Sequence, residues 1–178
     1  LNKGKKMYKF LVFIIVFIKT SFLLAGDIDQ KVNNLITGMY ELETWLDDDK
    51  IYEYPDVTGT LSINNGQIGF TLDNRINKNK TIKVIGWGNY ILNNNEFKYQ
   101  YTDFKVLILS DGEEITNDKL PWEGYRVYDL KLQEDVLLLS ANSGNQTWKL
   151  DTKNLVYTDK EWGADKKFAQ RIWKRITN

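Results

Sequence analysis

Apolar and polar side chains alternate along most of the chain, and Asn and Gly interrupt the alternation at short intervals. In YELETWL, residues 40–46, one face carries Tyr40, Leu42, Thr44 and Leu46, and the other carries Glu41, Glu43 and Trp45. A period of two is typical of a β-strand with one buried face. The alternation therefore predicts a protein built mainly from half-buried strands.

The stretch LSINNGQIGFTL, residues 61–72, contains the clearest turn signal in the chain. Asn65-Gly66 separates two alternating segments, and this dipeptide favours the two-residue type I′ turn of a β-hairpin. The pairs expected from this turn are Ile63 with Ile68 and Leu61 with Phe70. We predict that these four side chains share one face, which lines either a packed core or a cavity.

Further segments alternate in the same way and are separated by polar turns. They cover residues 81–92, 97–109, 124–132, 136–141 and 146–150, with the longest polar loop at residues 111–123. Gly86 and Gly88 flank Trp87, and glycines inside a strand often mark a bulge or a sharp bend. This spacing predicts an all-β fold, an antiparallel up-and-down β-barrel of about eight strands.

Two segments have helical spacing instead. Residues 27–38 carry apolar side chains at helical intervals and reach Gly38, a typical residue after a helix end. Residues 165–178 place Phe168, Ile172 and Ile176 on one stripe among several Lys and Arg residues. We predict a short N-terminal helix and a C-terminal amphipathic helix from about residue 164. Such a basic helix could contact an anionic membrane surface, but packing against the outside of the barrel is the favoured interpretation.

The first 26 residues have the features of an export signal. A Lys-rich start precedes the apolar run LVFIIVFI, and small residues follow near Gly26. Lys19 ends the run after eight residues, too few for a membrane anchor of about 20 residues. We predict a cleaved signal peptide at residues 1–26, an exported protein that is periplasmic or secreted, and a single domain at residues 27–178.

Charge and composition narrow the possible functions. Residues 1–26 hold five Lys and no acid, so the remaining chain has 19 basic and 24 acidic residues and a net charge of −5. This surplus of acid argues against binding to nucleic acid. With no His and no Cys, the chain cannot form a Ser-His-Asp triad, a Cys-His pair or an ordinary zinc site. We expect no cofactor and no metal, because the acidic runs lack the spacing of a calcium loop.

Four stretches carry a resemblance to a known family. They are ITGMYELETW at residues 36–45, YPDVTGTLSINNGQI at 54–68, GNYIL at 88–92 and YDLKLQEDVLLLS at 128–140, the last followed by Trp148. In their order and spacing the chain resembles the bacterial lipocalin-like domains of the lipocalin, or calycin, group. It departs from them in carrying Tyr40 in place of the Trp of a Gly-x-Trp signature, and in extending over residues 151–178 beyond their usual end.

The resemblance implies a barrel that is open at one end and holds a small hydrophobic or amphipathic ligand. The candidate ligand-binding residues are Tyr40, Leu42, Leu61, Ile63, Ile68, Phe70, Trp87, Tyr90, Trp122 and Tyr125. The loop that contains Pro121 and Trp122 is long enough to act as a flap over the mouth, with an ordinary surface connection as the simpler interpretation. We expect a monomer whose partner is a small apolar ligand.

Two other functions remain open at this point. One is an enzyme of the isomerase or hydrolase kind that uses the same cavity, for example through Arg126 paired with Asp129 or Glu123. A buried carboxylate or Arg inside the barrel would favour it, and a wholly apolar interior would favour a carrier. The other is a binding or inhibitor module that acts through its loops, for which a filled interior and an exposed Trp122 would be the signs.

Overall fold

The computed structural model describes residues 30–93, 95–163 and 165–177. The chain divides into two compact units, residues 1–33 and residues 34–178. Residues 30–36 are helical, which confirms a short helix within the predicted range 27–38. The predicted signal peptide and residues 27–29 lie outside the described residues. No helix in the described part of the chain has the length and apolar character needed to cross a membrane.

The described residues of the larger unit form twelve strands, which are antiparallel to their neighbours. They are β1 (Gly38–Asp47), β2 (Lys50–Tyr52), β3 (Val57–Asn64), β4 (Gln67–Asn77), β5 (Lys80–Asn93), β6 (Glu96–Ser110), β7 (Glu113–Asn117), β8 (Arg126–Gln133), β9 (Val136–Ala141), β10 (Gln146–Leu150), β11 (Asn154–Trp162) and β12 (Lys167–Thr177). β7 occupies part of the predicted loop 111–123, so the connection before β8 is shorter than expected.

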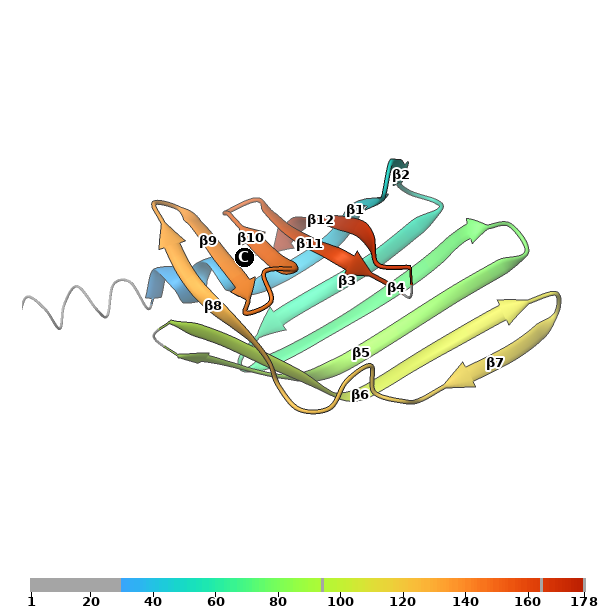
Figure 1. Ribbon diagram of the computed structural model, residues 1–178, viewed down its shortest axis with the longest axis horizontal. Coiled ribbons are helices and arrows are strands. Elements are labelled where there is room, and N and C mark those ends of the chain that lie inside the picture. Colours follow the sequence, from blue (N-terminus) through green and yellow to red (C-terminus); the bar gives the residue numbers. More distant parts are fainter. Residues whose placement is uncertain (1–29, 94, 164, 178) are drawn as a thin grey trace, which may run out of the picture. The chain divides into compact units, whose positions relative to one another are not determined.

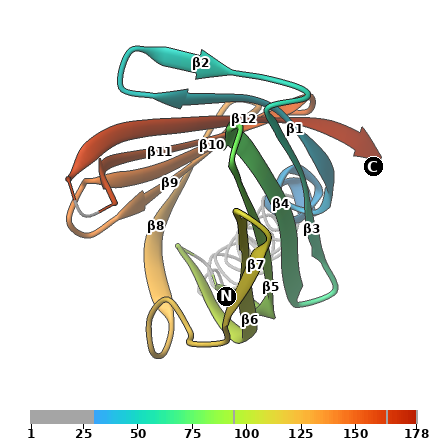
Figure 2. The same cartoon turned by 90° about the vertical axis from the view of Figure 1, so that its right-hand side faces the viewer.

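Ten of these strands form a closed barrel (Figures 1 and 2). Consecutive strands pair from β3 through β6 and from β8 through β12, β6 pairs with β8, and β1 pairs with both β3 and β12. β2 and β7 are hairpin arms that lie outside the barrel. The predicted antiparallel barrel is confirmed, but the number of strands is ten and not eight, because residues 151–178 supply two more.

The C-terminal helix that we predicted is wrong. Residues 167–177 form β12, which pairs with β11 on one side and with β1 on the other and so closes the barrel. Residues spaced by four share a face in a strand as well as approximately in a helix, so Phe168, Ile172 and Ile176 fit both structures. The strand forms because β11 and β1 would otherwise each leave an unpaired sheet edge, and β12 pairs with both of them. The helix on which a membrane contact was considered does not form.

The predicted hairpin is confirmed in its register. Leu61 pairs with Phe70 and Ile63 with Ile68 across the turn between β3 and β4. Both turn residues have positive φ, 49° for Asn65 and 76° for Gly66, as a type I′ turn requires. A local signal was sufficient here because two adjacent residues set the geometry of the turn.

The first strand begins as predicted and then changes face. Tyr40 and Leu42 are buried, but a bulge between Leu42 and Thr44 shifts the alternation by one residue. As a result Trp45 is only 6% exposed, whereas Leu46 is partly exposed. The prediction that Trp45 belongs to the outer face is therefore wrong, since one extra residue in a strand reverses the side-chain pattern that follows it.

The barrel has a packed half and a hollow half. Residues 34–36 and the turns before β4, β6 and β9 lie at one end, which we call the closed end. Side chains near it have 0% exposure: Ile36, Tyr40, Ile63, Ile68, Phe97, Leu137, Leu139 and Leu150. The loops before β8, β10 and β12 lie at the other end, which we call the open end. The closed half therefore contains a continuous core.

Candidate functional site

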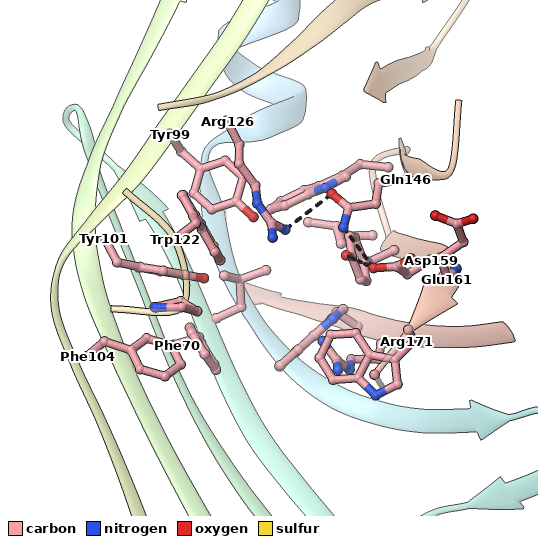
Figure 3. A pocket seen from close by; sticks show the side chains of 18 residues that line it. Phe70, Tyr99, Tyr101, Phe104, Trp122, Arg126, Gln146, Asp159, Glu161 and Arg171 are labelled. Atoms are coloured by element: carbon pink, nitrogen blue, oxygen red, sulfur yellow. Dashed lines mark hydrogen bonds between the residues drawn. The ribbon is translucent and has the colours of Figure 1, made fainter. Parts of the chain in front are cut away.

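A cavity of about 310 Å³ opens at the open end of the barrel (Figure 3). Its volume is at the lower limit of the sites that hold small organic ligands, roughly 300 Å³ and above. Eighteen residues line it, and nine of these are aromatic. In Figure 3, Phe70, Tyr101 and Phe104 lie on one side, and Gln146, Asp159, Glu161 and Arg171 lie on the other. The cavity therefore has an aromatic wall and a polar wall.

The cavity exists because β6 separates from β8. The two strands pair over Glu96–Tyr99 and Arg126–Asp129 only, after which β6 continues outward and pairs with β7 (Figure 1). The connection at residues 118–125 covers the resulting gap. It places Trp122 against Tyr101, with ring centroids 4.9 Å apart, and against Tyr99, at 5.6 Å. The predicted flap residue thus forms part of the cavity lining.

A bulge in β6 builds the aromatic wall. The register between β5 and β6 shifts after Trp87, which pairs with Asp103, while the next residue, Gly88, pairs with Tyr101. The extra residue in β6 lets Tyr101 and Phe104 both face the cavity although they are three positions apart. Their ring centroids lie 5.5 Å from each other. The predicted irregularity at the glycines flanking Trp87 is confirmed.

Glycine opposite Phe70 positions the third ring of this wall. Phe70 pairs with Gly86, and a Cβ atom at Gly86 would lie 2.4 Å from the Phe70 ring. Real Cβ atoms do not approach other atoms this closely, so the Phe70 ring occupies space that only glycine leaves open. The ring lies 5.5 Å from Tyr101 and 6.1 Å from Phe104. The three rings form a continuous apolar surface.

A hydrogen-bonded chain forms part of the polar wall. The Gln146 Oε1 accepts hydrogen bonds from the Arg126 Nη1, at 3.2 Å, and from the Tyr128 hydroxyl, at 2.9 Å. Its Nε2 donates to the Asp159 Oδ2 at 2.8 Å. Arg126 also stacks on Trp122, with 3.7 Å between the guanidinium carbon and the ring centroid. Gln146 therefore links a cation on β8 to a carboxylate on β11.

Asp159 is a buried carboxylate with its oxygens occupied. It is 4% exposed, and its Oδ2 accepts a second hydrogen bond, at 3.0 Å, from the Tyr157 hydroxyl. Its Oδ1 accepts the backbone N–H of Glu161 at 2.9 Å. Three donors for one carboxylate satisfy a buried charge and fix its orientation.

Arg171 is the second cation of the cavity and has a different environment. It extends from β12 between two tryptophans, with its guanidinium carbon 4.2 Å from the Trp162 centroid and 4.5 Å from that of Trp45. Among the described residues, none forms a hydrogen bond or an ion pair with this guanidinium, and its Nε is buried without a partner. Burial lowers the pKa of Arg171. The group still carries its charge at neutral pH, because a guanidinium keeps its proton in proteins even when it is buried.

Several tyrosines around the cavity remain neutral at physiological pH. Burial raises the pKa of Tyr99, Tyr101 and Tyr157 above its ordinary value, and for Tyr157 the nearby Asp159 raises the pKa further. Burial is the main cause because an ionised phenol is poorly solvated inside the protein. Each of these hydroxyls therefore keeps its proton and can donate a hydrogen bond, as Tyr157 does to Asp159.

Comparisons with protein-family profiles, with curated proteins and with solved structures found no match to this chain. The resemblance to lipocalin-like domains accordingly stays a prediction.

The cavity brings together three of the ten predicted ligand-binding residues, Leu61, Phe70 and Trp122. Five others are buried in the barrel: Tyr40, Leu42, Ile63, Ile68 and Tyr90. Trp87 and Tyr125 are 46% and 40% exposed. The predicted face of the hairpin is therefore divided, with Leu61 and Phe70 at the cavity and the other two residues in the core.

Sequence reasoning missed most of the polar wall. Arg171 and Trp173 had been assigned to a helix, and Asp159 and Trp162 lie in a strand that was not predicted. The alternation of LVYTD at residues 155–159 was the signal available for β11. Arg126 had been named as an enzyme candidate, but it bonds to Gln146, while the partners considered for it, Asp129 and Glu123, are exposed.

Proposed function

We propose that this chain is a lipocalin-like carrier that binds a small amphipathic ligand, without a covalent bond, inside the open half of the barrel. The observation that carries the proposal is the cavity with an aromatic wall facing a polar wall. Burying an apolar body against the rings supplies the affinity, and the polar groups fix the orientation of the ligand.

A purely loop-based binding module is less well supported. Such a module needs a filled barrel and an exposed Trp122, whereas the barrel is filled in one half only and Trp122 lines the cavity. An enzyme finds support in the buried Asp159 and in the two cavity arginines. However, both oxygens of Asp159 accept hydrogen bonds from protein donors that fix its position, which supports a role in orienting a ligand. Binding is therefore the function that the geometry supports best.

The proposal is tested with N-phenylnaphthylamine, a neutral ring probe that fluoresces in apolar surroundings. We expect saturable binding by the purified protein. Trp122→Ala should weaken this binding about tenfold, which corresponds to about 1.4 kcal/mol of lost ring contact. Trp87→Ala is the matched control, since Trp87 lies 46% exposed outside the cavity. Absence of binding, or equal losses in the two variants, would contradict the proposal.

Export and a monomeric state belong to the same proposal. They are supported by the Lys-rich and apolar pattern of residues 1–26 and by the size of the barrel unit. We expect the cellular protein to have the mass of residues 27–178 and to elute from a sizing column as a monomer. A full-length protein in the cytosolic fraction would contradict export.

A further inference from the structure

Two arginines and two carboxylates line the cavity, but the carboxylates are not equally buried. Two arginines, Arg126 and Arg171, face one buried carboxylate, Asp159. A second carboxylate, Glu161, lies exposed at the rim, where it accepts a hydrogen bond from Asn145 and pairs with Lys166 at 3.8 Å. The interior of the cavity therefore carries one positive charge in excess.

The excess can be assigned to one side chain. Arg126 donates to Gln146 and stacks on Trp122, so part of its charge is compensated by the protein. Arg171 has ring faces beside it and attracts Asp159 at longer range, but no described acceptor lies within hydrogen-bond distance. A guanidinium with five donors that faces a cavity without an acceptor is an unsatisfied group.

We infer that the ligand of this cavity is a ring compound with a single carboxylate or sulfonate group, which pairs with Arg171 while the rings of the ligand pack against Phe70, Tyr101 and Phe104. The inference rests on the proposed function and names the chemical class of the ligand. A carboxylate, or two of the three oxygens of a sulfonate, can accept two hydrogen bonds from the fork of N–H donors that arginine presents. A cationic ligand would instead meet two like charges.

The lining also favours rings over a flexible chain. Nine of its eighteen residues are aromatic, and four of these rings, Phe70, Tyr101, Phe104 and Trp122, lie opposite Arg171 with neighbouring centroids 4.9–6.1 Å apart. Flat rings stack on such a surface with little loss of conformational entropy, whereas an alkyl chain loses rotational freedom about each of its bonds when it is bound. The distance from the rings to Arg171 is spanned by the body of the ligand.

Two fluorescent probes with the same ring skeleton test the inference. Anilinonaphthalene sulfonate carries one sulfonate, and N-phenylnaphthylamine lacks it, so the ratio of their dissociation constants isolates the contribution of the negative charge. We expect the protein to bind the sulfonate at least about tenfold more tightly than the neutral probe. In Arg171→Gln this preference should fall to about one, while the affinity for the neutral probe stays the same.

Two further variants serve as controls. Arg171→Lys keeps the charge and should retain most of the preference for the sulfonate. Arg75→Gln removes an arginine whose side chain is 54% exposed and paired with Asp73, and it should change neither affinity. Near-ultraviolet circular dichroism of each variant shows whether the packed half is retained.

The outcomes separate the two proposals. Equal binding of both probes by the unmodified protein, or a preference that persists in Arg171→Gln, overturns the inference about the anion and leaves the carrier in place. Binding of neither probe overturns the carrier and the inference with it. If Arg171→Gln keeps its fold but loses affinity for both probes, Arg171 maintains the shape of the cavity and does not recognise an anion. This result also overturns the inference.

Discussion

The same ten strands build two halves of one barrel that differ in almost every physical property. Near the closed end, Phe97 has no exposed surface and lies within 5.7–6.4 Å of four other rings. Near the open end, Phe104 is partly exposed and borders a cavity. Both residues belong to β6. The difference arises because β6 leaves β8 after Tyr99, so that the two walls no longer converge.

Strand pairing, and not the type of side chain, decides where the core ends. Aromatic residues occur in both halves, yet they fill the first and only line the second. The two halves can be distinguished by variants of matched residues and by the pH dependence of stability.

The largest difference is expected between Phe97→Ala and Phe104→Ala. Removing the buried ring should lower the free energy of unfolding by about 4 kcal/mol, since it leaves a void in a packed core. Phe104→Ala should cost about 1 kcal/mol, because its ring already borders empty space. Urea unfolding measures both values. Equal losses would show that the two halves are packed alike.

A second contrast uses two arginines on β12. Arg175 donates to the Leu35 and Thr37 carbonyl oxygens and to the Tyr40 hydroxyl near the closed end, whereas Arg171 faces the cavity. Arg175→Met should therefore cost about 3 kcal/mol of stability, as it removes hydrogen bonds from a charged donor. Arg171→Met should leave the stability unchanged or raise it by up to about 1 kcal/mol, because an uncompensated charge is removed. Thermal unfolding distinguishes the two results, and a larger loss for Arg171→Met would contradict the assignment of its charge to a ligand.

The change in the pH dependence of stability caused by Tyr40→Phe tests the closed end. Burial raises the pKa of Tyr40 to about 12 from its ordinary 10.0. Below pH 10 both states hold the proton, and as the pH rises from 10 to 12 the unfolded chain loses it first, so the free energy of unfolding falls. This group should account for about 2 kcal/mol of the fall by pH 12. In Tyr40→Phe the decrease between pH 10 and 12 should be smaller by that amount. An unchanged slope in urea titrations would refute the contribution of Tyr40.

The smallest effect compares two glycines that face opposite sides of the wall. A Cβ atom at Gly86 would lie 2.4 Å from the Phe70 ring, and one at Gly69 would lie 2.1 Å from the Trp87 ring. Either alanine variant should cost about 1 kcal/mol of stability from the displaced ring. Only Gly86→Ala should also weaken probe binding, by a factor of about five, because Phe70 moves into the cavity whereas Trp87 moves into solvent. Equal probe affinities in the two variants would contradict this placement of Phe70.

Part of the fold was predictable because its signals are local. The register of β3 and β4 follows from the conformations that Asn65 and Gly66 adopt, and the alternation of apolar residues was sufficient to indicate an antiparallel barrel. The bulge in β1 was not predictable, because nothing in YELETWL marks the residue after which the alternation shifts. Trp45 faces inward only because β1 must pair with β3 at its start and with β12 along its length.

The candidate site was predictable in one wall and not in the other. Phe70 and Trp122, two of the candidate ligand-binding residues, line the cavity. The first was proposed from a hairpin register and the second from a long loop. Arg171 could not be recognised, because an isolated segment that is rich in Lys and Arg fits an exposed helix equally well. Its position inside the barrel depends on β12 being the last strand between β11 and β1, and this requires partners that are more than a hundred residues apart.

The sequence by itself determined the strands, the turns and the all-β class. Backbone conformation in turns and the alternation of apolar and polar side chains in strands both depend on residues that are close in the sequence. Ring closure by β12, the separation of β6 from β8 and the uncompensated charge of Arg171 were decided by tertiary structure. These features depend on which distant segments pair with each other and on how their side chains pack. The cavity forms where strand pairing ends, and the charge of Arg171 lies inside it.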